Sequence, residues 1–360
     1  MPVRRILNKL CSNLRSTNAA RPNRRAKPTR VRLSPETLDD RIVPSASSFN
    51  LHSVQQPDGN SAAFFRNPAN DVFTEKTPQA QIVQLAAAHE VTDFSAGLDP
   101  NGHADVFAHK DGVMQEFDAG SWQNLNQPRP MLSFAAVNGG RMYAVANDNS
   151  LWEFAQAHNV TYTVYLMGQP RTFTVLVPAQ WTELWGANAV WALDAVTQTS
   201  NSFDMVFAIG GDGRLEKYVP SSNTWYLLAA GNTFSSFSAG LDTDGYADVF
   251  MVSNSGYLER WTTLSGVFAT VDHFDNPLDV NISASSSGGV FCMFSGNFDG
   301  TIRIAEYDRQ NHLISFVLPP HDNITAMSVD GPNDVYVITS DGSLQEHPTS
   351  GPNDVWVIWT

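Results

Sequence analysis

The chain has 360 residues, of which 42% are hydrophobic, and a formal net charge of −14. It contains no stretch of 18 or more apolar residues, which argues against a membrane-spanning helix. Residues 48–360 hold 33 acidic against 11 basic side chains, so this body is not expected to bind nucleic acid, whose phosphates require a basic surface.

The first 47 residues form a basic leader that carries the other 11 Lys and Arg. Its composition predicts a disordered arm, and ILNKLCSNL is too short and too polar for the hydrophobic segment of a signal peptide. The segment RLSPETLDDRIVPSAS then resembles the N-terminal sorting motif of many extracellular planctomycete proteins. The matching positions are Leu33, Glu36, Leu38, Arg41, Pro44 and Ser45. The resemblance implies an extracellular or cell-envelope location; an ordinary linker is the alternative.

The body that follows consists of repeats. FSAGLDPNGHADVF at 94–107 returns as FSAGLDTDGYADVF at 237–250. In each unit an apolar run leads into a polar turn and then into a strand that alternates apolar and polar residues. An Asp-Gly turn between such runs is typical of a tight β-hairpin. The turns are Asp111-Gly112, Asn149-Ser150, Asp212-Gly213, Ser255-Gly256, Asp299-Gly300 and Asp341-Gly342, with Asp58-Gly59 in a weaker first unit.

Four short strands per unit, with no convincing long helix between them, predict an all-β fold: a β-propeller of four-stranded blades. The blades are expected at about 48–91, 92–131, 132–190, 191–233, 234–279, 280–323 and 324–360. Seven blades are favoured, and six is the alternative if 48–91 only covers the ring. The third unit is longer because VTYTVYL-MGQP-RTFTVLV inserts a hairpin. The last strand should pair either as the outer strand of the last blade or beside the unit at 48–91.

Three phrases carry a resemblance to lectin-type propellers: GHADVFAHKDGVMQEF, GYADVFMVSNSGYLERW and FDMVFAIGGDGRLEKYV. They are similar to the repeats of the tectonin family and of a seven-bladed bacterial lectin family. The resemblance implies either sugar binding between blades or a protein-interaction scaffold. The final phrases, GPNDVYVI and GPNDVWVI, resemble those of another kind of bacterial propeller.

Tryptophans are the candidate ligand-binding residues, because an aromatic face packs against the apolar face of a pyranose ring. Trp122, Trp181 and Trp225 recur on the expected fourth strand, and Trp152 and Trp261 lie on the third. Packing between sheets is the alternative, because a repeated ligand site and a repeated packing position look alike in sequence.

Two loops are candidate calcium sites. Calcium prefers six or more oxygen ligands, and the loops supply Asp99, Asn101 and Asp105, or Asp242, Asp244 and Asp248. The first ligand of the full pattern falls on a glycine in both, and a tight hairpin turn explains the same residues without metal. No other cofactor is indicated.

Catalytic signatures are lacking: no Gly-x-Ser-x-Gly phrase and no metal-spaced histidine pair occurs. Cys292 lies in an apolar strand and is expected to be a buried, inert thiol, while Cys11 belongs to the leader. We therefore expect a secreted or cell-envelope binding propeller, not an enzyme, whose partner is a glycan. The alternatives are a scaffold that binds envelope proteins without sugar, and a propeller enzyme acting on an extracellular glycan.

Overall fold

The computed structural model describes residues 51–360, apart from 119, 167–168, 187–189, 211, 231–233, 276–279, 286–287, 296–301, 309–312, 318–323, 331–333, 349–355 and 360. All of the described residues lie in one compact unit. The basic leader, with the segment that resembles a sorting motif, lies outside them.

Seven antiparallel sheets of four strands follow one another along the chain. Blade 1 contains β1 (Leu51–Gln55), β2 (Ser61–Arg66), β3 (Phe73–Lys76) and β4 (Ile82–Ala86). Blade 2 contains β5 (Val91–Leu98), β6 (Ala104–Lys110), β7 (Val113–Asp118) and β8 (Ser121–Asn124). Blade 3 contains β9 (Met131–Val137), β10 (Arg141–Ala146), β11 (Leu151–Ala155) and β14 (Gln180–Trp185).

The other four blades repeat this order. Blade 4 contains β15 (Val190–Thr197), β16 (Asp204–Gly210), β17 (Leu215–Val219) and β18 (Thr224–Ala229). Blade 5 contains β19 (Phe234–Leu241), β20 (Ala247–Ser253), β21 (Tyr257–Thr262) and β22 (Phe268–His273). Blade 6 contains β23 (Asn281–Ala284), β24 (Val290–Ser295), β25 (Ile302–Tyr307) and β26 (Leu313–Val317). Blade 7 contains β27 (Ile324–Asp330), β28 (Asp334–Thr339), β29 (Leu344–Pro348) and β30 (Val357–Trp359).

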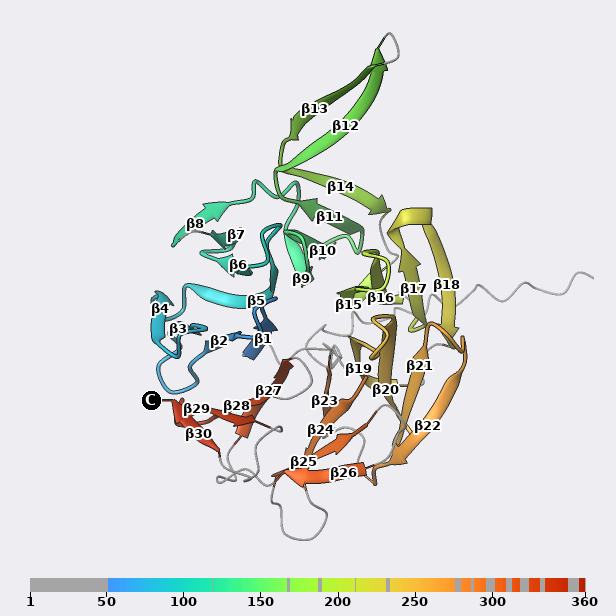
Figure 1. The fold of residues 1–360 in the computed structure, drawn as a ribbon. Coiled ribbons are helices and arrows are strands. Elements are labelled where there is room, and N and C mark those ends of the chain that lie inside the picture. The colour runs from blue at the N-terminus through green and yellow to red at the C-terminus, as the bar shows by residue number, and fades with distance from the viewer. Residues whose placement is uncertain are drawn as a thin grey trace, which may run out of the picture. The chain divides into compact units, whose positions relative to one another are not determined.

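The blades are arranged in a ring, with the first strand of each on the inside (Figure 1). Each first strand contacts the first strand of the next blade, and β27 contacts β1, so the ring is closed. The predicted all-β, seven-bladed propeller is thereby confirmed, and the six-bladed alternative is excluded because residues 51–86 form a complete blade. The helical content of the described residues is one short 3₁₀ turn, Pro220–Ser222.

The sequence assignment of one turn in blade 1 was wrong by one strand. The Asp58-Gly59 turn of blade 1 joins the first strand to the second, whereas in the other blades the Asp-Gly turn joins the second to the third. It therefore corresponds to the Asp99–Gly102 turn of blade 2. The second-to-third turn of blade 1 is 67–72, where Asn67 accepts hydrogen bonds from the backbone and replaces the Asp-Gly pair.

The hydrophobic core is divided among the seven interfaces between neighbouring blades. The second strand of each blade contributes side chains to both interfaces of that blade. In β6, Val106 and Ala108 pack toward blade 1, while Phe107 packs toward blade 3. Both faces of such a strand are buried, which explains why these strands read as continuous apolar runs and not as alternating ones.

Hydrogen bonds join the inner strands of most neighbouring blades. A side chain near the middle of one inner strand accepts the backbone N–H of the inner strand in the next blade, which satisfies a donor that the sheet leaves free. Among the described residues these bonds are Ala136 N–Ser95 Oγ (2.9 Å), Ala239 N–Asp194 Oδ2 (2.8 Å), Ala284 N–Ser238 Oγ (3.1 Å), Val329 N–Ser283 Oγ (3.2 Å) and Ser53 N–Ser328 Oγ (3.0 Å).

Four of these five acceptors are serines, and the fifth is Asp194. The hydrogen bonds of its two oxygens explain why an aspartate occurs here. Blade 3 has Ala135 at the serine position, so it offers no acceptor to Ala195 of blade 4. Asp194 Oδ1 accepts the Ala195 N–H at 2.8 Å, while Oδ2 accepts Ala239 N–H. One carboxylate therefore accepts an N–H of its own strand and an N–H of the next blade.

This arrangement predicts a pH dependence of stability. Loss of solvent contact raises the pKa of Asp194 from 3.8 to about 6 in the folded chain. The folded state then binds the proton more tightly than the unfolded state, so the contribution of Asp194 to stability is greatest below about pH 4 and declines as pH rises to about 6. The decline should be about 3 kcal/mol in the free energy of unfolding.

Urea denaturation between pH 4 and 8 measures it. The double variant Ala135→Ser with Asp194→Ser supplies hydroxyls for both N–H groups and should lack this part of the decline, whereas Ala135→Ser alone should keep it. Identical pH profiles for the three proteins would contradict the assignment.

The ring closes between blades 1 and 7 through side chains. The last strand, β30, pairs with β29 as the outer strand of blade 7, which is the first of the two predicted placements. Lys76 of blade 1 is buried and lies 3.1 Å from the carboxylate of Glu346 in blade 7. Its Nζ donates to Tyr336 Oη at 3.2 Å and lies 5.0 Å from the ring centre of Trp359. Trp359 in turn donates its indole N–H to Glu346.

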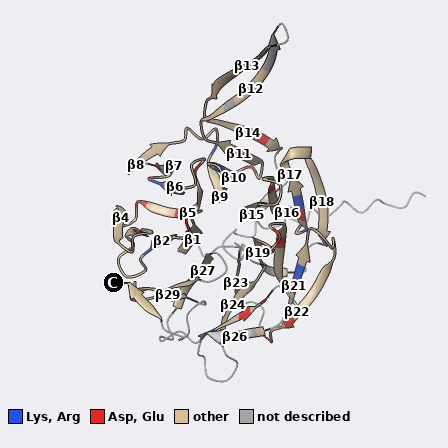
Figure 2. Ribbon diagram, in the orientation of Figure 1, with Lys and Arg blue, Asp and Glu red and all other residues tan. Residues whose placement is uncertain are grey.

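The inserted hairpin consists of β12 (His158–Leu166) and β13 (Gln169–Val177), and it forms a separate two-stranded sheet. It leaves blade 3 between β11 and β14 and projects outward from the ring (Figure 1). No acidic residue occurs in it, in contrast to the body as a whole (Figure 2). Three apolar side chains of β13 are exposed: Phe173 by 44%, Val175 by 47% and Leu176 by 63%.

Candidate functional site

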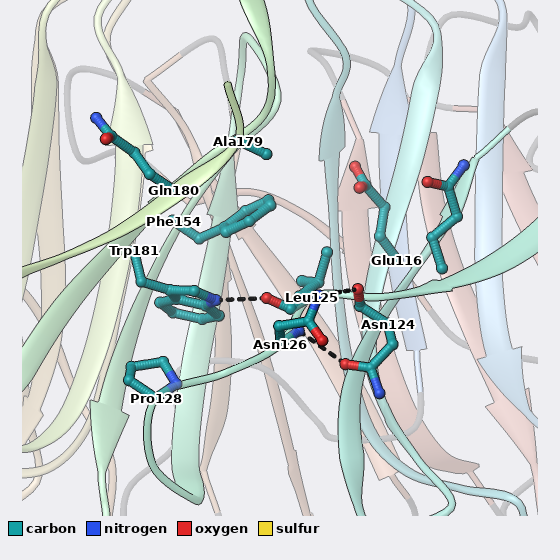
Figure 3. A pocket seen from close by; sticks show the side chains of 10 residues that line it. Glu116, Asn124, Leu125, Asn126, Pro128, Phe154, Ala179, Gln180 and Trp181 are labelled. Atoms are coloured by element: carbon teal, nitrogen blue, oxygen red, sulfur yellow. Dashed lines mark hydrogen bonds between the residues drawn. The ribbon is translucent and has the colours of Figure 1, made fainter. Parts of the chain in front are cut away.

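A cavity of about 420 Å³ lies between the outer parts of blades 2 and 3, close to the base of the hairpin. We call it the 2–3 pocket. It is lined by Glu116, Gln123, Asn124, Leu125, Asn126, Pro128, Phe154, Ala179, Gln180 and Trp181. Figure 3 shows Trp181, Phe154 and Gln180 on one side, Glu116 and Asn124 on the other, and Leu125 with Asn126 between them.

The aromatic wall of the 2–3 pocket is Trp181 with Phe154. Their ring centroids are 5.2 Å apart, and the indole N–H of Trp181 donates to the carbonyl of Leu125 in blade 2 at 2.9 Å. This bond fixes the ring across the blade interface. Trp181, a candidate from the sequence, is therefore both an inter-blade clamp and a wall of the cavity.

The polar wall of the 2–3 pocket consists largely of amides. Asn124 Oδ1 accepts the backbone N–H of Asn126 at 2.7 Å, which holds the loop after β8 in place. Gln123 and Gln180 make no side-chain hydrogen bond to another described residue, so their amide groups are available to a ligand. Amides that offer donors and acceptors beside an aromatic wall suit a ligand rich in hydroxyl groups.

A pair of buried carboxyl groups lies at the edge of the 2–3 pocket. Glu116 on β7 lines it, and Asp105 on β6 lies behind Glu116. The Nε2 group of Gln156 donates to both, to Asp105 Oδ2 at 2.7 Å and to Glu116 Oε1. Burial, the hydrogen bond with Glu116 and the charge of Glu116 raise the pKa of Asp105 well above its usual range. Two carboxyl groups this close together repel each other when both are charged.

Trp122 occupies the same position in blade 2 as Trp181 does in blade 3. Its indole N–H donates to the carbonyl of Leu85 in blade 1 at 2.9 Å, and its ring lies 5.2 Å from that of Phe117. Trp225 keeps the position in blade 4 and packs 4.6 Å from Trp185, but its buried N–H has no partner among the described residues. The recurrence of these tryptophans thus coincides with inter-blade packing.

The two third-strand tryptophans lie apart from the 2–3 pocket. Trp152 is partly buried and donates to Ser150 Oγ at 2.7 Å, with the guanidinium of Arg129 at 5.9 Å from its ring centre. Trp261 is buried between blades 4 and 5, and Lys217 Nζ lies 4.6 Å from its ring centre. The structure therefore brings one of the five candidate tryptophans into the 2–3 pocket.

The candidate calcium loops are first-to-second strand turns. Asp99 Oδ1 accepts the backbone N–H groups of Asn101 and His103, both at 2.8 Å. In the second loop, Asp242 Oδ1 does the same for Asp244 and Tyr246, at 2.9 and 2.8 Å. Such turns explain the aspartates without metal.

The remaining candidate ligands, Asp105 and Asp248, point into other contacts. Asp105 meets Gln156, and Asp248 forms a buried ion pair with Arg260. No group of three or more His, Cys, Asp or Glu among the described residues is placed to hold a metal. That the chain binds no cofactor stays a prediction, and a thermal melt tests it: we expect the same melting temperature with calcium and with EDTA, and a rise with calcium would restore the loops as sites.

Several blades carry an aspartate at the start of the second strand, among them Asp204, Asp248 and Asp334. The described ones form hydrogen bonds, but with different partners. Asp204 accepts from Tyr143 Oη at 2.8 Å and pairs with Arg141 of blade 3, while Asp248 pairs within its own blade. The side chain of Asp334 lies outside the described residues. Cys292 is fully buried, as expected, and burial raises the pKa of its thiol.

Most of the 2–3 pocket was not anticipated from the sequence. Three of its four amides, all but Gln180, belong to one segment, SWQNLNQPRP at 121–130, whose high amide content is a visible signal. Glu116 and Gln156 carried no such signal, because one lies on a regular strand and the other follows the end of one.

A second cavity, of about 460 Å³, lies at the inner strands. Side chains from the first strands and the loops that follow them line it, including Gln55, Leu98, Asn138, Thr197 and Ser285. None of its lining residues is charged, which sets it apart from the acidic body.

Comparisons with known proteins identify the fold. No family model and no curated protein matches the chain. Among solved structures it is similar to the β-propeller domain of Myceliophteria thermophila Cps50 (Swd1), with a TM-score of 0.53 and 9% identity over 85% of this chain and 98% of that one. It is also similar to the structure of U3-55K, with a TM-score of 0.51 and 12% identity over 81% of this chain and 88% of that one.

The first of these neighbours is described as a β-propeller domain, and neither is described as a lectin. At such low identity the likeness concerns the fold alone: the chain is a seven-bladed β-propeller. The described residues include no helix with the length and hydropathy to cross a membrane.

Proposed function

We propose that this propeller is a binding protein of the cell envelope or the extracellular space, and that the 2–3 pocket takes a carbohydrate. The observation that carries the proposal is the pairing of the Trp181–Phe154 wall with amides on the opposite side. A pyranose ring needs both, because one face of it is apolar and its edge carries hydroxyl groups. The pocket is also of a size that suits one or two sugar residues.

A glycan array with the purified chain tests the proposal, followed by titration calorimetry of any sugar it retains. We expect Gln180→Ala and Gln123→Ala to weaken binding by about tenfold each, since each removes a hydrogen-bonding group worth about 1–1.5 kcal/mol. Trp225→Phe is the matched control, because Trp225 lies in another interface and should leave affinity unchanged. A folded protein that retains no glycan would overturn the sugar proposal, and turnover of a glycan would indicate an enzyme.

A second candidate function is a protein-interaction scaffold, and the hairpin favours it. Three exposed apolar side chains on β13, on a ribbon with two unpaired edges, form a surface of the kind that protein partners cover. The absence of acidic residues on β12 and β13 removes the repulsion that the rest of the body would exert on an acidic partner.

A pull-down from envelope extract discriminates between the two functions. If the hairpin carries the function, Phe173→Ser with Val175→Ser should lose the retained protein while glycan binding persists. Leu264→Ser with Val267→Ser is the control, because these apolar side chains are even more exposed but lie on blade 5. Equal retention by both variants would exclude the hairpin.

The extracellular location rests on the leader segment with Leu33, Glu36, Arg41 and Pro44. Cell fractionation of a tagged chain tests it. We expect the intact chain in the envelope or medium, and a chain lacking 33–45 inside the cell. Export of both would remove the support that the segment gives.

A further inference from the structure

The near-identical repeats of blades 2 and 5 differ at one buried charge. Asp105 of blade 2 corresponds to Asp248 of blade 5, since both stand before Val-Phe in the phrase ADVF. The strand registers fix the second correspondence: Phe107 pairs with Glu116, and Phe250 pairs with Arg260. Glu116 therefore stands where blade 5 has an arginine.

In blade 5 this arrangement is a complete ion pair. Arg260 Nε donates to Asp248 Oδ2 at 2.9 Å, and both side chains are buried. In blade 2 the aspartate faces a second carboxyl instead of a guanidinium. None of the ion pairs among the described residues includes Asp105 or Glu116. Oδ1 is buried without a hydrogen-bond partner in both Asp105 and Asp248, so the two blades differ in the counter-charge and not in this oxygen. Blade 2 thus lacks the cation that the matching repeat in blade 5 contains, Arg260.

The missing cation has an entry route, because Glu116 lines the 2–3 pocket. Burying a carboxyl pair without a cation is unfavourable, and the same burial and the charge of Glu116 raise the pKa of Asp105. A ligand cation beside Glu116 would take the place of Arg260 in blade 5.

We propose that the 2–3 pocket is specific for a sugar that carries a primary ammonium group, which is placed against Glu116 with Asp105 and Gln156 behind it. The proposal rests on the carbohydrate function above and names the class of sugar. It distinguishes the chain from a binder of neutral glycans, for which the amides and aromatic rings would suffice.

Titration calorimetry with two matched tetrasaccharides tests it: the tetramer of glucosamine and the tetramer of N-acetylglucosamine, which differ in the charge and acetylation of the amine. We expect the glucosamine tetramer to bind at least about tenfold more tightly, the usual effect of one charge-assisted hydrogen bond. Equal binding of the two would overturn the ammonium inference and leave the carbohydrate function standing. A lysine-containing peptide that binds while neither sugar does would overturn the carbohydrate function and retain the cation site.

Two variants distinguish an effect on binding from an effect on folding. Glu116→Gln keeps the shape and removes the charge, so it should abolish the preference for the glucosamine tetramer. Glu116→Arg reproduces the Asp–Arg pair of blade 5, so it should fold with an equal or higher melting temperature and lose binding of the amine. If Glu116→Arg folds and still binds the glucosamine tetramer as the native chain does, the proposal is wrong.

Discussion

Lys76→Ala should lower the free energy of unfolding by about 3–5 kcal/mol, the usual effect of removing one partner of a buried ion pair. Lys76 is 3.1 Å from Glu346 and connects blade 1 to blade 7. Without it, the Glu346 carboxylate keeps Tyr336 and Trp359 as hydrogen-bond donors but has no counter-charge. The ring has no shared sheet at this closure, so the loss acts where blades 1 and 7 meet through side chains.

Urea denaturation at pH 7 measures this effect, with two comparisons. Arg214→Ala removes a half-exposed pair with Asp212 and should change stability by less than about 1 kcal/mol. Lys76→Met with Glu346→Gln removes both buried charges and should recover much of the loss. If Lys76→Ala is as harmless as Arg214→Ala, blades 1 and 7 are not held together in the way described.

Gly240→Ala is the second substitution with a large expected effect. A Cβ at Gly240 would lie 2.5 Å from the backbone oxygen of Ser285 in blade 6, and a Cβ at Gly97 would lie 2.7 Å from that of Val137 in blade 3. The close approach also allows the Leu241 N–H to donate to Ser285 O at 3.1 Å. Because backbone atoms cannot move aside as a flexible side chain does, we expect a loss of about 1–3 kcal/mol.

Thermal and urea unfolding of Gly240→Ala and Gly97→Ala measure this loss. Gly186→Ala is the matched control, since a Cβ there has no heavy atom within 4 Å. It should leave stability unchanged or raise it by about 0.5 kcal/mol, through a less flexible unfolded chain. Equal melting temperatures for all three variants would show that the inner strands are not packed against each other as tightly as described.

The architecture could be predicted from the sequence because it depends on local, repeated signals. Turn residues such as Asp111-Gly112 and alternating strands such as 113–118 are readable one unit at a time, and a repeated unit with unpaired edges closes into a ring. Gly97 and Gly240, in the two FSAGL phrases, have a role that the sequence did not reveal. Their role as points of contact between blades depends on neighbours 40 to 45 residues away in the chain.

The candidate site was predicted only in part, for a physical reason. Trp181 has a visible signal, since it is a large aromatic side chain at a repeated position. Glu116 looks like any polar residue of an alternating strand, and its meaning appears only when Asp105 lies behind it and Arg260 is seen to replace it in blade 5. Side chains from two blades make the pocket, and which faces meet is set by the ring and not by either repeat alone.

The location of the ligand is the most direct test of the proposed function. A crystal structure of the chain grown with the glucosamine tetramer would provide it. We predict sugar density between blades 2 and 3, with a pyranose ring against Trp181 and its amine beside Glu116. Density confined to the uncharged cavity at the inner strands, or a 2–3 pocket left empty at saturating sugar, would contradict it.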